Sequence, residues 1–289
     1  MSIYRTVQRV IDAPLASDGE GVVIHRAFPN HELNELDPFL LLDHMGPVDL
    51  KPGEAKGFPD HPHRGFETVT YLLAGEFEHR DSFGHHGVLR PGDVQWMTAG
   101  SGLVHSEVPG ASLVKNGGRL EGFQLWVNLP RKDKMKAPRY QEFSASQIPV
   151  ARSADGTVEV KVIAGAAMGV KGAVETHIPI EYLHFKLQPG AKHVQEVAAG
   201  LNAMIYVISG WLLVGGTSVP AFHLASLTVD KDAVEFCTDG PTEFLLVAAK
   251  PIHEPVARYG PFVMNTEAEL HQAFADYKAG RMGSISLRA

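Results

Sequence analysis

Two pairs of potential metal ligands stand out in the sequence, His61 with His63 and His105 with Glu107. Within each pair the residues are at positions i and i+2, so on a β-strand both side chains leave from the same face. Two such strands side by side would present three imidazoles and one carboxylate to a single point. This set suits a divalent first-row metal better than structural zinc, which usually takes four ligands and leaves no position free. The sequence therefore predicts a metal site made of these four residues.

Such a site predicts particular chemistry. The ligands suit Fe(II), Mn(II), Co(II), Ni(II) or Cu(II), and four ligands on an octahedral ion leave two positions open for water, substrate oxygen atoms or dioxygen. A bound metal can lower the pKa of a hydroxyl as a Lewis acid, and a redox-capable ion can pass electrons to O2. Glu107 has a second, hypothetical role as a catalytic base that leaves the metal to accept a proton. Metal-assisted isomerisation or hydrolysis, which needs no O2, is an open alternative.

Further residues are candidates for the surroundings of the metal. Glu67 follows His63 by four positions and is expected to face the same way, either as a fifth ligand or, the interpretation that we favour, as a pocket residue or an acceptor for an imidazole N–H. The other candidates for a substrate pocket are Phe66, Trp96, Met97 and Gln124. The three apolar side chains among them are equally consistent with the packed core of a barrel.

Other side chains of this region receive simpler interpretations. Arg64 is expected to point away from the ligands and to form a structural ion pair. His79, His85 and His86 lie in a predicted hairpin between the two ligand pairs, and a surface loop is the simpler interpretation for the last two. Trp126 is interpreted as an aromatic side chain packed in a barrel wall.

The elements that must hold these residues have the pattern of β-strands. From residue 57 onward, strand-sized runs alternate with turns rich in Gly, Pro and Asp, such as residues 90–93 (RPGD). Many short strands at this spacing indicate an all-β sandwich or barrel. The rhythm returns in the second half, where residues 206–210 (YVISG) match residues 71–75 (YLLAG). The sequence therefore predicts a duplicated β-barrel.

The two halves differ in their potential ligands. Where the second half should carry paired histidines it has His193 and Gln195, and no later segment repeats the pattern of His105 and Glu107. We therefore expect a metal-binding N-terminal barrel over residues 1–130, a linker over 131–140, and a barrel without metal ligands over 141–289. Near the end, a capping box at 266–269 (TEAE) predicts a short C-terminal helix that stops at Gly280.

The composition limits the classes of function. The 289 residues are 44% hydrophobic and carry a net charge of −7, which excludes a disordered chain, and no basic run supports direct nucleic-acid binding. Because Cys237 is the only cysteine, no disulfide within the chain and no thiolate cluster can form, which fits a reducing location. We recognise no signal sequence and no apolar run of membrane-spanning length, and so expect a cytoplasmic protein.

Several segments resemble the pirin family of the cupin superfamily. They are residues 39–43 (FLLLD), 58–69 (FPDHPHRGFETV), 92–100 (GDVQWMTAG) and 260–266 (GPFVMNT), so the resemblance covers essentially the whole chain. It implies a bicupin, two tandem jelly-roll β-barrels, whose N-terminal barrel binds a metal, usually iron, through His61, His63, His105 and Glu107. It also implies a C-terminal barrel that has lost its ligands, and a carboxylate ligand taken from the second motif in place of Glu67.

The resemblance implies two functions. Some members of that family are quercetin 2,3-dioxygenases, oxidoreductases that open the central ring of flavonols with O2 and release carbon monoxide. Others are metal- and redox-sensitive regulators that bind protein partners such as transcription factors. We predict the first function, with Fe(II) as the cofactor and a small aromatic, flavonol-like molecule and O2 as substrates. The non-catalytic regulator is the alternative.

Overall fold

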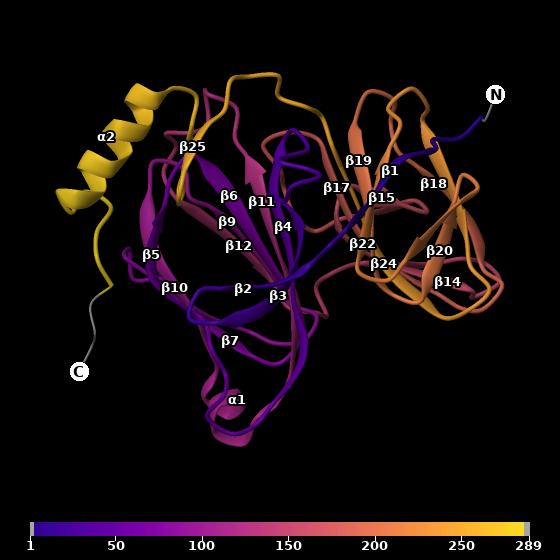
Figure 1. Cartoon of the computed structure of the whole chain (residues 1–289), viewed down its shortest axis with the longest axis horizontal. Coiled ribbons are helices and arrows are strands. Elements are labelled where there is room, and N and C mark those ends of the chain that lie inside the picture. The colour runs from indigo at the N-terminus through magenta and orange to yellow at the C-terminus, as the bar shows by residue number, and fades with distance from the viewer. Residues whose placement is uncertain (1–2, 286–289) are drawn as a thin grey trace. The chain divides into compact units, whose positions relative to one another are not determined.

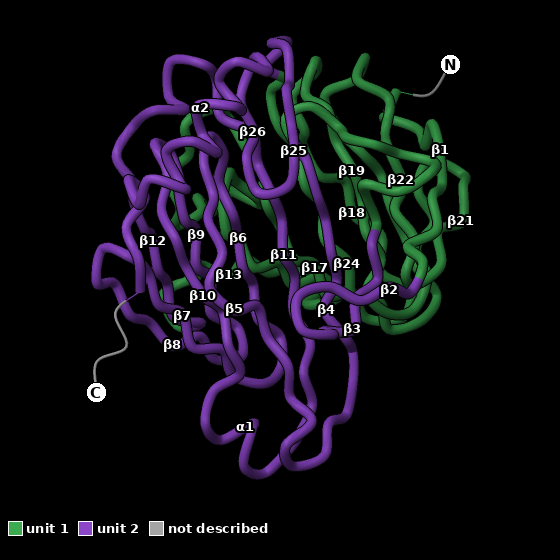
Figure 2. Tube along the Cα trace, turned by 60° about the vertical axis from the view of Figure 1, so that its left-hand side comes forward, with its two compact units in different colours: residues 1–14, 27–38, 146–251 green, residues 15–26, 39–145, 252–289 purple. Residues whose placement is uncertain are grey.

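Nearly all regular structure in the chain is β-strand, as Figure 1 shows for the computed structural model, which describes residues 3–285. The chain divides into two compact units (Figure 2). Unit 1 contains the residues up to 14, residues 27–38 and residues 146–251. Unit 2 contains residues 15–26, residues 39–145 and the residues from 252 onward.

Unit 2 is built from two sheets that face each other. The first has the order β12-β9-β6-β11-β4-β3-β2 and the second the order β5-β10-β7-β8. The strands of the first sheet are β2 (Leu15–Asp18), β3 (Val22–Phe28), β4 (Phe39–Leu50), β6 (Phe66–Ala74), β9 (Val94–Thr98), β11 (Gly118–Asn128) and β12 (Arg139–Phe143). Those of the second are β5 (Phe58–His63), β7 (Phe77–Asp81), β8 (His86–Leu89) and β10 (Leu103–Pro109). The unit also contains α1 (Ala111–Asn116), α2 (Glu267–Lys278) and the hairpin of β25 (Ala257–Tyr259) and β26 (Phe262–Met264).

Unit 1 repeats this plan. Its sheets have the orders β1-β22-β19-β24-β17-β14-β13 and β18-β23-β20-β21. The strands of the larger sheet are β1 (Val7–Asp12), β13 (Val150–Arg152), β14 (Val158–Ala164), β17 (Ile180–Leu187), β19 (Asn202–Ser209), β22 (His223–Leu227) and β24 (Thr242–Ala249). Those of the smaller are β18 (Lys192–Glu196), β20 (Trp211–Val214), β21 (Thr217–Pro220) and β23 (Ala233–Cys237), and β15 (Ala166–Ala167) pairs with β16 (Val170–Lys171).

The two units share one topology, which confirms the predicted all-β fold with two tandem barrels. Read from β9 to β2 and from β22 to β13, the larger sheets follow the chain in the same order, and so do the two smaller sheets. The interiors differ, because unit 1 is filled by an apolar cluster that includes Phe185, Phe236 and Phe244. Their ring centroids lie 4.9–5.2 Å apart.

The expected domain boundaries differ from this division at both ends of the chain. β1 pairs with β22, so the first strand completes a sheet of unit 1, although it lies in the range that we assigned to the N-terminal barrel. Arg5, which precedes it, is fully buried, and its guanidinium donates hydrogen bonds to five backbone carbonyls of unit 1. Conversely, the segment after residue 251, with α2, belongs to unit 2.

The segment predicted as a linker, residues 131–140, is part of unit 2. Its Lys134 is buried, and Nζ donates hydrogen bonds to the carbonyls of Gly65 and Val263 and to Oδ1 of Asn128. Charge and proline content suggested a solvated connection, but this ammonium group finds three acceptors in the interior, so the segment packs against the barrel. Arg139 then begins β12, which pairs with β9.

The predicted C-terminal helix is confirmed as α2. Oγ1 of Thr266 accepts a hydrogen bond from the N–H of Glu269, and the Glu269 carboxylate accepts one from the N–H of Thr266, which is the predicted capping box. Leu270 and Ala273 are buried, and the ring of Phe274 packs on that of Phe262 at 4.8 Å. Neither this helix nor any other between residues 3 and 285 has the length and apolar character needed to cross a membrane.

Candidate metal centre

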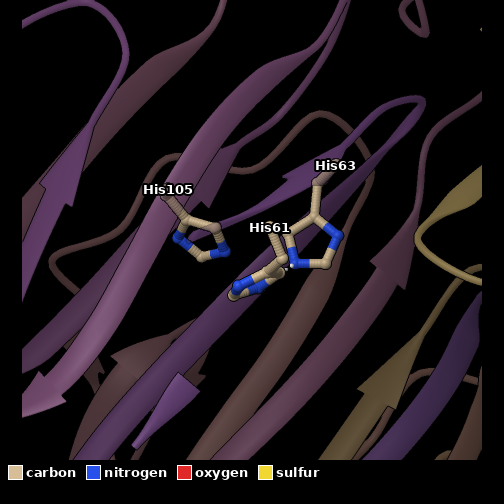
Figure 3. A group of neighbouring side chains, drawn as sticks. All are labelled: His61, His63 and His105. Carbon is tan, nitrogen blue, oxygen red and sulfur yellow. Dashed lines mark hydrogen bonds between the residues drawn. The ribbon is translucent and has the colours of Figure 1, made fainter. Parts of the chain in front are cut away.

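Two neighbouring strands, β5 and β10, bring the predicted ligand pairs together. They pair antiparallel, with His61 opposite His105 and His63 opposite Leu103. The candidate ligand nitrogen atoms of His61, His63 and His105 all lie within 4.8 Å of one another, and Figure 3 shows the three rings gathered around one point. The i, i+2 spacing therefore places the histidines as predicted.

Hydrogen bonds fix the tautomers of the first two histidines. Nδ1 of His61 lies 2.8 Å from the carbonyl oxygen of Pro59, and Nδ1 of His63 lies 3.3 Å from that of Pro261. Because a carbonyl oxygen can only accept, each Nδ1 carries a proton, and the tautomer that this selects presents the lone pair of Nε2. Backbone carbonyls are common outer partners of metal-bound histidines.

The arrangement of these nitrogen atoms fits a bound cation. The Nε2 atoms of His61 and His63 are 3.0 Å apart, and in these tautomers neither carries a proton to share. Nε2 of His105 is buried and has no hydrogen-bond partner in the described part of the chain. Burial moves the pKa of both His63 and His105 well below the ordinary value, so the two rings stay neutral, as metal ligation requires. The three imidazoles therefore meet the chemical requirements of a divalent metal site.

Glu107 lies beside this group with its carboxylate held by other side chains. A register shift separates it from His105 on β10. Its two oxygen atoms accept hydrogen bonds from Oγ1 of Thr70 at 2.7 Å and from Nε2 of Gln124 at 2.9 Å. Burial raises the pKa of Glu107, and these hydrogen bonds oppose the rise. The structure thus brings three of the four predicted ligands together, while ligation by Glu107 stays a prediction.

A cavity of about 380 Å3 opens at the histidines, within the range of small-molecule sites. His61, His63, Glu107 and Gln124 form its polar part, and Asp43 lies farther along the wall. The apolar part is formed by Ile24, Leu41, Met45, Phe58 and Trp126. The turn between β2 and β3 also contributes to the lining. A flat aromatic molecule would find apolar contacts here next to polar and acidic groups.

Two of the predicted pocket residues lie close to the histidines. Gln124 lines the cavity and donates to Glu107. Phe66 is buried with its ring 5.0 Å from that of His63 and 4.5 Å from that of Trp126. Trp126 itself, interpreted from the sequence as wall packing alone, lines the cavity and lies 5.1 Å from the ring of His63. Trp126 therefore forms the aromatic wall beside the histidines, and Phe66 packs against it without lining the cavity.

Glu67, Trp96 and Met97 are placed differently from the expectation. Glu67 is opposite Thr98 and accepts a hydrogen bond from its hydroxyl, on the face of β6 that points away from Thr70. Trp96 lies on the same face, and Met97 packs in a separate apolar cluster. None of the three is among the residues that line the cavity.

A glycine explains why counting from His63 failed. Gly65 has φ +88° and separates β5 from β6, so the alternation of faces does not continue from one strand to the next. The ion pair predicted for Arg64 is present, with its guanidinium 2.7 Å from the carboxylate of Asp276 in α2. Among the hairpin histidines, His85 and His86 contact Glu142 and Glu78, as expected near a surface.

Sequence reasoning missed two contacts that reach the site from outside the ligand pairs. Thr70 lies directly opposite Gln124 across β6 and β11, and both hold Glu107. His79 is buried on β7, and its Nε2 lies 2.9 Å from Nδ1 of His105. The only signal in the sequence for the contact of His79 with His105 was its position in a strand between the two ligand pairs. No local pattern indicated the contact of Thr70 with Glu107.

Comparisons with known proteins agree with this architecture. The family model Pirin matches residues 21–127, and the model of the Pirin C-terminal cupin domain matches residues 182–283. The chain belongs to the pirin family. Pirin from Homo sapiens is 44% identical over 274 residues, which cover 92% of this chain and 90% of the human protein. A pirin-like protein from Solanum lycopersicum is 45% identical over 283 residues, covering 96% and 93% of the two chains.

A solved structure of similar fold carries an enzyme name. Quercetin 2,3-dioxygenase from Acinetobacter baumannii superposes with a TM-score of 0.93 and 36% sequence identity, covering 98% of this chain and all of that one. The pirin family and its two cupin domains are thus established for this chain. Unit 2, which holds the three histidines, contains most of the segment matched by the first family model.

Proposed function

We propose that the chain is a metal-dependent dioxygenase that opens the central ring of flavonols such as quercetin with O2. The observation that supports it most is the meeting of three imidazole nitrogen atoms and a buried carboxylate at one end of an aromatic-walled cavity. The likeness to the Acinetobacter quercetin 2,3-dioxygenase supports the substrate class. The proposed ligands are His61, His63, His105 and Glu107, and the proposed metal is Fe(II), with Mn, Co, Ni and Cu as alternatives.

The metal and the chain would contribute different parts of the chemistry. A redox-capable divalent ion supplies Lewis acidity and a path for electrons to O2. The chain orients the substrate, since a flavonol has flat rings that can pack against Trp126 and Phe58. The remaining wall excludes water from those rings.

Glu107 is the proposed acceptor for the proton of a substrate hydroxyl. Burial raises the pKa of Glu107, and a carboxylate with a raised pKa is a better base than an ordinary one. Thr70 and Gln124 hold the carboxylate in place, so it need not be reoriented for proton transfer. If Glu107 also binds the metal, the same two side chains set the direction from which it does so.

An aerobic assay of the Fe(II)-loaded protein with quercetin tests this proposal. We expect oxygen uptake and carbon monoxide release in equal amounts, and loss of both in His61→Ala. The matched control is His86→Ala, because His86 is exposed and bonded to Glu78. Failure to turn over with Fe, Mn, Co, Ni and Cu in turn would refute a dioxygenase of this substrate class. Full activity of His61→Ala would refute the site.

Two further measurements separate the remaining alternatives. Turnover of a substrate under anaerobic conditions would indicate metal-assisted isomerisation or hydrolysis in place of oxygenation. A protein partner captured only in one oxidation state of the metal, by a protein without any turnover, would favour the regulator.

A further inference from the structure

We propose that His79 is a positioning residue for the metal site: through its hydrogen bond to Nδ1 of His105 it aims Nε2 of His105 at the point that His61 and His63 share. The inference rests on the proposed metal site but not on the proposed substrate.

The strand register brings His79 to this position. β7 pairs antiparallel with β10, with His79 opposite Glu107 and Asp81 opposite His105. His79 and His105 are therefore diagonal neighbours on one face of the ladder, a separation that ring side chains can span. Their ring centroids are 5.1 Å apart and the two facing nitrogen atoms 2.9 Å apart. Both residues are buried.

The outer partner of His105 differs from those of the other two histidines. His61 and His63 each have a backbone carbonyl at Nδ1, which can accept but never donate. His105 has an imidazole instead, and an imidazole nitrogen can do either. The tautomer of His105 is therefore set by the tautomer of His79 and not by a backbone carbonyl.

Only one of the two arrangements allows His105 to bind a metal. If Nδ1 of His105 donates to Nε2 of His79, the lone pair of Nε2 of His105 points to the shared site. If Nε2 of His79 donates instead, the proton of His105 lies on Nε2 and blocks ligation. In the first arrangement the proton of His79 lies on Nδ1, which is buried and has no hydrogen-bond partner in the described residues, so that arrangement carries the cost of one unsatisfied N–H.

A second contact fixes the position of the His79 ring. The hydroxyl of Tyr140 lies 3.4 Å from the same Nε2 atom of His79, and the two rings are 5.1 Å apart. Burial raises the pKa of Tyr140, and so does its hydrogen bond with the Asp81 carboxylate, so the hydroxyl keeps its proton. The carboxylate of Asp81 competes for that proton, so Tyr140 holds the ring of His79 in place without deciding its tautomer. The ring of His85 stacks on Tyr140 at 4.1 Å and holds it in place.

Two nearly isosteric substitutions test the role. In His79→Gln the amide oxygen can still accept from Nδ1 of His105, whereas in His79→Met no acceptor of similar strength remains. We expect the affinity for Co(II), measured by competition with a chelator, to fall by about 10–100-fold in His79→Met, the usual effect of losing an outer partner. His79→Gln should recover most of that loss, and the visible absorption of the Co(II) protein should change only in His79→Met. His86→Met, at an exposed site, is the control.

Equal Co(II) affinity and spectra in wild type and His79→Met would overturn the inference, because a purely space-filling role predicts no difference. Should His79→Met fail to fold, the metal-free wild-type protein decides the question through the nitrogen NMR signals of its histidines. A proton on Nδ1 of His105 is the expected result, and a proton on Nε2 overturns the proposal. Both readouts are independent of quercetin, so a failed dioxygenase assay leaves them unaffected. A wild-type protein that binds no Co(II) would overturn both the metal site and this inference.

Discussion

Gly65 connects the two strands that carry the site and its wall, and its replacement by alanine should damage both stability and metal binding. Its φ of +88° lies in the region that disfavours other residues, and a Cβ atom there would lie 2.0 Å from the carbonyl oxygen of Val263. That oxygen accepts a hydrogen bond from Lys134, and the N–H of Val263 donates to the carbonyl of Arg64. The clash therefore falls on backbone that is already held from two sides.

The expected loss in the free energy of unfolding of Gly65→Ala is the sum of two separate costs. The backbone conformation alone costs alanine about 1–2 kcal/mol. Moving the carbonyl of Val263 far enough to admit a methyl group breaks at least one buried hydrogen bond, at about 1–3 kcal/mol each. We expect Gly65→Ala to lower the free energy of unfolding of unit 2 by about 2–5 kcal/mol. Gly84→Ala isolates the first cost, because Gly84 has φ +86° and nothing within 4 Å of the added Cβ.

Urea unfolding followed by tryptophan fluorescence is a suitable assay, because Trp96 and Trp126 both lie in unit 2 and the chain has only three tryptophans. Gly84→Ala should lose about 1–2 kcal/mol and keep its metal affinity. Gly65→Ala should lose more and bind Co(II) more weakly, since His63 lies two residues away. Equal losses in the two variants would refute the argument from the close approach of Val263.

Three further predictions concern stability. Arg5→Met should destabilise unit 1 by about 3 kcal/mol or more in urea unfolding, because buried carbonyls lose their donor. Arg9→Met, at an exposed position, should change the free energy of unfolding little. Glu181→Gln should stabilise the protein at pH 8 but not at pH 5. Burial raises the pKa of Glu181 to about 7, so the folded wild type loses stability as the pH rises from about 4.5 to 7. A series of denaturation curves across this pH range checks the prediction. Removing the metal with a chelator should lower the melting temperature, since a ligand at 100 times its Kd adds about 2.7 kcal/mol to the folded state.

Local periodicity was sufficient to predict part of the site. The i, i+2 spacing placed His61, His63 and His105 because strand alternation is nearly independent of the rest of the fold. The ion pair of Arg64 and the capping box of α2 followed from equally local rules. The strand rhythm and its repeat likewise predicted two barrels, since each short strand and turn carries its own signal.

Features that depend on strand pairing could not be predicted in this way. Glu67 was assigned to the wrong face because Gly65 interrupts the alternation between two strands that look continuous in sequence. The contacts of His79 and Thr70 with the site depend on which strands become neighbours and in what register. The sequence of a strand contains no information on which distant strand it will pair with. For the same reason β1 was assigned to the N-terminal barrel, although it pairs with β22 of unit 1.

Among the described residues only unit 2 holds a group of three histidines that could bind a metal, and comparison of the two barrels suggests why. On β18 and β23 of unit 1, His193 lies opposite Phe236, whereas on β5 and β10 of unit 2, His61 lies opposite His105. Phe236 packs with Phe185 and Phe244, and burying a phenylalanine side chain contributes about 1.5–3 kcal/mol. Unit 2 gives up this packing for three imidazoles and a cavity, and a buried nitrogen without a partner, such as Nε2 of His105, destabilises a barrel interior. Metal binding would offset that cost, so the effect of a chelator should be confined to the transition of unit 2, and an equal effect on unit 1 would contradict this account.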